Sequence, residues 1–187
     1  MVQRLSWSLA SAPPYSEPHY VSGGSSQCLV KSEHPANGYE AHLQALLWAC
    51  RKLFIEEDGE AIWHFDAGKA DARQIPAEEL FFLPEEWRTG KACRPDAGSP
   101  QVTDGGKRPY WQAFLLPPYG CSYTADDFRK VNAALFPDGT DRLEVYEWTT
   151  GWSEYFDEGR EWWGTLCVTA YDPGTDRFAV ILASATD

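Results

Sequence analysis

Residues 163–184 read WGTLCVTAYDPGTDRFAVILAS, and this stretch decides the fold. Its two halves, 163–171 and 177–184, are rich in the aromatic and β-branched residues that are typical of strands. The link between them reads DPGTD, and its Pro173 and Gly174 suit a tight turn. The sequence therefore predicts that these residues form a β-hairpin near the carboxyl end of the chain.

Two more segments have strand-like composition, 110–116 and 142–150. Within the second, polar and apolar residues alternate from Arg142 to Trp148. Successive side chains of a strand point to opposite faces, so this pattern predicts one face toward water and one toward the core.

Helical spacing of apolar residues predicts a long helix over 37–55, with Asn37 as its cap and Glu40 completing a capping box. A shorter helix is predicted to start at Thr124 and to end before Phe136, and an acidic helical turn is expected over 76–83. We therefore expect an α+β fold, in which an antiparallel sheet packs against one long and one shorter helix.

The length of 187 residues suits one domain, 1–187, with a single core. Between residues 89 and 109 the chain is dense in Gly, Pro and charged residues and offers little to bury. We interpret this stretch as a long flexible loop, locally basic through Lys91, Arg94, Lys107 and Arg108.

Acidic residues outnumber basic ones by 28 to 16, which gives a formal charge of −12. This charge repels nucleic acid and anionic membrane surfaces, so we expect neither as a partner. It attracts a cationic protein, although acidity also serves solubility alone. The sequence does not indicate an oligomeric state.

Five widely spaced cysteines form no C-x-x-C pair, which favours a reducing compartment, the cytoplasm. Cys50 and Cys167 have apolar neighbours and are interpreted as core residues, while Cys93 and Cys121 lie in predicted loops. Residues 1–12 only faintly resemble a signal peptide, because three serines interrupt them. The four histidines lack metal-ligand spacing, so we expect no metal and no cofactor.

The most informative segment, 149–164, reads TTGWSEYFDEGREWWG and mixes aromatic with acidic residues. Together with the preceding strand it supplies the candidate partner-binding residues. These are Trp152, Glu154, Tyr155, Asp157, Glu158, Glu161 and Trp162, with Glu144 and Glu147 from the strand.

Three interpretations of this segment stay open. In the first, the aromatic rings are buried at the end of the sheet and the acidic side chains are only its solvated edge. In the second, the rings and acids together form a binding hot spot for Lys and Arg of a partner protein. The third is a carbohydrate-active site, in which Trp platforms stack on sugars beside the paired carboxylates Glu154, Glu158 and Glu161 of a glycoside hydrolase. A noncatalytic carbohydrate-binding module is a variant of the third.

The pattern W-x-x-Y-F-x-x-G-x-E-W-W-G over 152–164, followed by the terminal hairpin, resembles small acidic bacterial immunity proteins of polymorphic or contact-delivered toxin systems. The resemblance covers the last third of the chain and transfers no residue-level role. It implies a small cytoplasmic protein that binds a cognate, basic toxin and neutralises it by occlusion.

Overall fold

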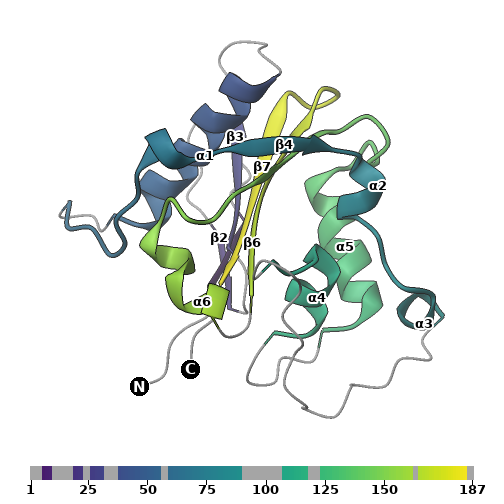
Figure 1. The fold of residues 1–187 in the computed structure, drawn as a ribbon. Helices are drawn as coiled ribbons and strands as arrows, with labels where there is room; N and C mark the ends of the chain where they lie inside the picture. The colour runs from purple at the N-terminus through teal and green to yellow at the C-terminus, as the bar shows by residue number, and fades with distance from the viewer. Residues whose placement is uncertain are drawn as a thin grey trace.

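The centre of the fold is a five-stranded antiparallel sheet, seen in a computed structural model that describes residues 6–9, 19–22, 26–31, 38–55, 59–89, 107–117, 123–161 and 164–184 (Figure 1). Its strand order is β3-β7-β6-β5-β4. The strands in that order are β3 (Ser26–Lys31), β7 (Arg177–Ser184), β6 (Thr165–Asp172), β5 (Glu144–Trp148) and β4 (Ala72–Ile75).

The predicted C-terminal hairpin is confirmed, and β6 and β7 pair from Thr165 with Ser184 to Asp172 with Arg177. Asp172 holds the turn, because its carboxylate accepts hydrogen bonds from the backbone of Gly174 and from the hydroxyl of Thr175, both at 2.8 Å. A side chain that bonds the backbone two residues ahead is a common turn device. The hairpin strands then occupy the middle of the sheet.

Both faces of the sheet are covered, so the prediction that β5 shows one face to water is wrong. Val145 packs into one core and Trp148 into the other. In β6 every residue is buried, because helices lie on both sides. One face of β6 carries Leu166, Val168 and Ala170, and the opposite face carries Cys167, Thr169 and Tyr171.

The long helix α1 (Tyr39–Leu53) covers one face of the sheet (Figure 1). Its start differs from the predicted cap, because Gly38 is the N-cap residue, with a φ of 94° that suits glycine, and it makes no side-chain cap. The carboxylate of Glu40 accepts a hydrogen bond from Gln44 instead. Asn37 lies outside the described residues.

Four shorter helices cover the other face: α2 (Ala77–Leu80), α3 (Glu85–Arg88), α4 (Tyr110–Leu115) and α5 (Ala125–Leu135). The predicted start of α5 is confirmed, since Thr124 and Asp127 form a capping box and Phe136 ends the helix. The acidic helical turn expected over 76–83 is α2.

The prediction of a strand over 110–116 is wrong, because this segment forms α4. Pro109 lies at the N-cap, and Tyr110, Ala113 and Phe114 are buried on one side of the helix. Their spacing of three and four residues is helical. The aromatic residues that suggest a strand form a helix–helix contact instead. The ring centroids of Tyr110 and of Phe128 on α5 lie 4.9 Å apart.

The remaining elements are short. They are the two-stranded sheet of β1 (Ser6–Leu9) and β2 (His19–Ser22), the 3-10 turns η1 (Ala67–Lys69) and η3 (Glu154–Phe156), and α6 (Asp157–Glu161). Most of the predicted 89–109 loop lies outside the described residues. At its end, however, Lys107 bridges to Thr165 and Arg108 is buried, so these two residues are part of the fold.

Candidate functional site

The aromatic side chains of the 152–161 segment point inward. Trp152 is only 2% exposed and donates its indole N–H to the carbonyl of Thr149. Its ring meets Phe65 and Phe156 in T-shaped contacts with centroids 6.3 and 5.6 Å apart. Trp152 is therefore a core residue, and the interpretation of it as an exposed anchor is wrong.

Tyr155 is half-buried and joins the same packed cluster. It stacks on Phe54 at the end of α1 with ring centroids 5.0 Å apart, and it meets Trp63 edge-on at 5.2 Å. Phe156 beside it is fully buried. These rings connect the segment to α1 and fix its backbone. Trp162 lies outside the described residues.

The carboxylates of the same segment point outward. Glu154, Asp157, Glu158 and Glu161 are all exposed on η3 and α6. We call these four residues the acidic face. The buried side of the segment therefore carries aromatic rings and the exposed side carries charges. This follows from the sequence, which has aromatic residues at 152, 155 and 156 and acids between and after them.

Two members of the acidic face have structural contacts. Glu154 accepts a hydrogen bond from the backbone N–H of His64 at 3.1 Å, and Asp157 pairs with Arg160, which donates to the carbonyl of Thr150 at 3.0 Å. In contrast, neither Glu158 nor Glu161 has an ion-pair partner among the described residues. These two carboxylates are free to meet an external cation.

The segment 59–69 runs beside the acidic face. Asp66 donates its N–H to the carbonyl of Trp152 at 2.8 Å, and Phe65 forms a β-bridge with Ser153. The side chain of Asp66 is exposed and pairs with Lys69, whose hydrogen bond is the main cause of a lowered Asp66 pKa. The two segments brace each other, so the acidic face stands on a fixed backbone.

Glu144 and Glu147, the strand residues of the predicted site, do not join the acidic face. They lie on opposite faces of β5, because Glu144 shares a face with Trp148 and Glu147 shares one with Val145. Glu144 accepts a hydrogen bond from the backbone of Gly38 at 2.6 Å. It therefore ties the start of α1 to the sheet.

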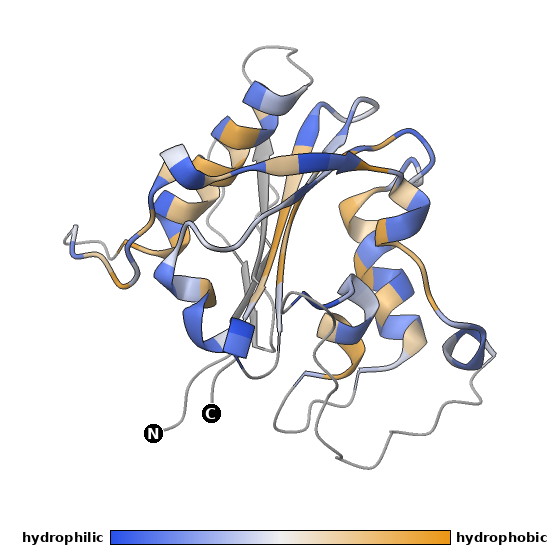
Figure 2. Cartoon of the chain, in the orientation of Figure 1, coloured by the Kyte–Doolittle hydropathy of each residue, from blue (hydrophilic) through white to orange (hydrophobic). Residues whose placement is uncertain are grey.

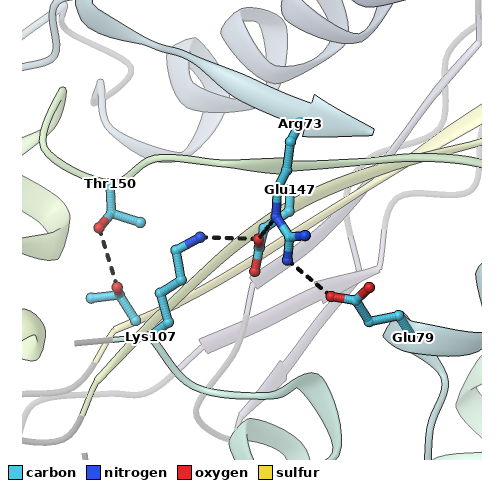
Figure 3. A network of polar contacts seen from close by, with 6 residues as sticks. Arg73, Glu79, Lys107, Glu147 and Thr150 are labelled. Atoms are coloured by element: carbon cyan, nitrogen blue, oxygen red, sulfur yellow. Dashed lines mark hydrogen bonds and ion pairs between the residues drawn. The ribbon is translucent and has the colours of Figure 1, made fainter. Parts of the chain in front are cut away.

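Glu147 is the centre of a separate ion network (Figure 3). Its Oε2 atom accepts from Nζ of Lys107 at 2.9 Å and from Nε of Arg73 at 2.8 Å, and Arg73 also reaches Glu79. Burial acts to raise the pKa of Glu147, but the hydrogen bonds and charges of Lys107 and Arg73 outweigh it and lower the pKa. The network holds Lys107 and the backbone beside it against the sheet.

A buried polar network under α1 has no signal in the sequence. The hydroxyl of Thr169 accepts a hydrogen bond from the indole of Trp148 at 2.8 Å, and it lies 2.7 Å from Nδ1 of His42. The other ring nitrogen, Nε2, lies 3.4 Å from a carboxylate oxygen of Glu144. If Thr169 donates to Nδ1, the ring proton is on Nε2 and points toward Glu144.

Thr169, His42 and Glu144 are connected in the same order as the nucleophile, base and orienting acid of a catalytic triad. However, His42 and Thr169 are fully buried, so no substrate reaches the hydroxyl. Burial lowers the pKa of His42 to about 4, although a hydrogen bond to the backbone of Thr169 acts in the opposite direction. His42 is therefore neutral at pH 7, and the network is structural.

The prediction that Cys50 and Cys167 are core residues is confirmed, since both side chains are buried. Cys93 and Cys121 lie outside the described residues. No cluster of three or more potential metal ligands occurs in the described ranges. The helices that the structure describes include none with the length and apolar character required to cross a membrane.

No protein-family model, curated protein or solved structure matches this chain.

Proposed function

We propose that this chain is an immunity-type protein, which binds a cationic bacterial toxin and blocks it by occlusion through the acidic face. The observation that carries the proposal is the exposure of Glu158 and Glu161 without a cation of their own in the described part of the chain. The net charge of −12 has the same sign as this surface. Both features favour a partner rich in Lys and Arg.

The proposed mechanism is electrostatic capture followed by steric blocking. The field of an acidic protein speeds the approach of a cationic one, and fixed carboxylates then pair with its Lys and Arg side chains. Because Trp152, Tyr155 and Phe156 anchor the segment from below, little backbone entropy is lost on binding. If the toxin binds phosphate groups through its Lys and Arg side chains, the acidic face occupies those side chains and blocks that binding.

The enzyme alternative has less support. A glycoside hydrolase holds its general acid in a partly buried, apolar setting, whereas the candidate carboxylates Glu154, Glu158 and Glu161 are all exposed. A carbohydrate-binding module needs an open indole face, whereas Trp152 is buried. The binding interpretation requires neither feature.

We place the protein in the cytoplasm, where an immunity protein meets an incoming toxin. The buried thiols of Cys50 and Cys167 suit a reducing compartment. The mechanism uses no cofactor, since charge pairing and occlusion are enough.

The test uses the basic protein encoded beside the gene for this chain, titrated calorimetrically against wild type and against Glu158→Lys/Glu161→Lys. We expect the double reversal to weaken binding roughly 10- to 100-fold, as removal and reversal of close charge pairs does elsewhere. Both residues are exposed, so the fold and its thermal midpoint should be retained.

The matched control is Asp138→Lys/Asp141→Lys, which changes the net charge equally at two exposed positions in the turn after α5. This turn lies across the molecule from α6 (Figure 1). We expect the control to change the affinity less than about threefold, because distant surface charges are screened. Equal losses in both variants, or none in either, would remove the acidic face from the account.

A further inference from the structure

A second surface emerges from the four apolar residues 80–83, which connect α2 to α3. Leu80 and Leu83 are buried at 5% and 8% exposure, whereas the side chain between them, Phe82, is 58% exposed. Within the described residues it is the most exposed large apolar side chain. Figure 2 shows this connection as an apolar stretch along the outer flank of the molecule.

Phe82 is held in place by its neighbours in the chain. Phe81 packs edge-on against Tyr110 and Phe136, with centroids 6.1 and 5.4 Å apart. Pro84 is the N-cap residue of α3. Within α3 the ring centroid of Trp87 lies 6.3 Å from that of Trp111 on α4. The backbone on both sides of Phe82 is therefore anchored in the core, and the exposed ring projects from this anchored backbone.

The other exposed aromatic side chains have partners inside the protein. Tyr39 donates its hydroxyl to the carbonyl of Ala70, and the ring of Trp48 lies 5.9 Å below the ammonium of Lys52. Phe82 has no ring contact in the described part of the chain. An exposed ring on an anchored backbone is typical of an interface anchor.

Three exposed carboxylates flank Phe82 in sequence, Glu78 on α2 and Glu85 and Glu86 on α3. None of them has an ion pair among the residues that the structure describes, unlike Glu79, which binds Arg73. One exposed cation, Arg88, follows them. The charges of these four residues sum to −2, which complements a cationic partner and opposes a second copy of this chain.

We propose that Phe82, with Glu78, Glu85 and Glu86, is a docking surface for a cationic amphipathic helix of a partner protein. One apolar side chain of that helix covers the ring. Lysine or arginine residues three and four positions away flank that side chain and meet the carboxylates, because such residues share one side of a helix.

This docking surface goes beyond the proposed function and does not depend on it. It lies on the α4 and α5 side of the sheet, whereas α6 and the acidic face lie on the α1 side (Figure 1). One surface has an exposed ring and the other has carboxylates alone. The two surfaces therefore select different partners, and either proposal can be disproved without affecting the other.

The probe is a fluorescein-labelled, 14-residue helical peptide of leucine and lysine, compared by anisotropy with a scrambled peptide of the same composition. Charge alone binds both peptides equally, so the preference for the amphipathic one reports the apolar contact. We expect a preference of about tenfold for the wild type, since truncating a hot-spot ring changes affinity by about that factor.

We expect Phe82→Ala to abolish the preference and Glu85→Gln/Glu86→Gln to weaken binding of the amphipathic peptide. Ile62→Ala, at another exposed apolar residue, and Glu158→Gln/Glu161→Gln on the acidic face should keep the preference. Circular dichroism checks that each variant is folded. A preference that survives Phe82→Ala would overturn the proposal. So would concentration-dependent dimers that Phe82→Ala dissolves, since the occupant would then be a second copy.

Discussion

The ring of His42 on α1 lies with its Nδ1 atom 2.7 Å from the hydroxyl of Thr169 on β6, and both residues are fully buried. This contact joins the long helix to the central strand across 127 residues of sequence. A buried polar pair is stable only while both groups are satisfied, so it makes the fold sensitive to changes at either residue.

Acid should destabilise the protein through His42. Its pKa is about 4 in the folded protein against an ordinary 6.5, so the unfolded chain binds more protons between these values. Stability is therefore complete above pH 6.5 and falls as the pH drops toward 4, by up to about 3 kcal/mol. Urea unfolding at a series of pH values measures this slope. His42→Gln should flatten it between pH 6.5 and 5, and an unchanged slope would assign it to other groups.

Thr169→Val should be strongly destabilising although the two side chains have similar shapes. The substitution leaves the indole N–H of Trp148 and Nδ1 of His42 without their shared partner in the core. We expect a loss of roughly 2–4 kcal/mol in the free energy of unfolding, from two buried groups left unpaired. Thr150→Val, which removes one half-buried bond to Thr165, should cost less than about 1 kcal/mol. Similar losses in both variants would contradict the network.

Glu147→Gln should lower stability at neutral pH by about 1 kcal/mol, since the cations that it binds are half exposed and screened. The lowered pKa of Glu147 means that its contribution is present above the ordinary value of 4.5 and disappears as the pH falls below it. The difference between variant and wild type should therefore shrink as the pH falls below 4.5, and it should also shrink in high salt. A difference that persists in acid would mean that packing, not charge, accounts for it.

Trp152→Ala should unfold the protein more readily, by about 3–5 kcal/mol, because a large buried ring is removed. Trp152→Phe keeps most of the packing and should leave binding of the basic partner unchanged. Thermal denaturation and calorimetric titration measure the two effects. A folded Trp152→Phe variant with weakened binding would restore this residue to the binding surface.

Local patterns predicted the elements whose causes are local. The hairpin follows from strand composition around Pro173 and Gly174, and the start of α5 follows from Thr124 and Asp127. Residues 110–115 show the limit of composition, because their aromatic content indicates a strand while the spacing of Tyr110, Ala113 and Phe114 fits the observed helix. Periodicity was the better signal there.

The site was harder to predict because its parts depend on distant residues. The acids of 154–161 lie at the surface, but the burial of Trp152 depends on Phe65, far away in sequence. Glu144 and Glu147 are three residues apart and therefore lie on opposite faces of β5. The sequence does not indicate that Phe82 is exposed, because the burial of each residue in an apolar run depends on how the run packs in the fold.

The most direct test of the immunity proposal is the residual activity of the neighbouring basic toxin, measured against increasing amounts of this protein. Wild type and Asp138→Lys/Asp141→Lys should both abolish the activity near a one-to-one ratio. Glu158→Lys/Glu161→Lys, equally folded, should need roughly 10- to 100-fold more protein. A toxin that wild type leaves active, or that the acidic-face variant neutralises as well as wild type does, would contradict the account.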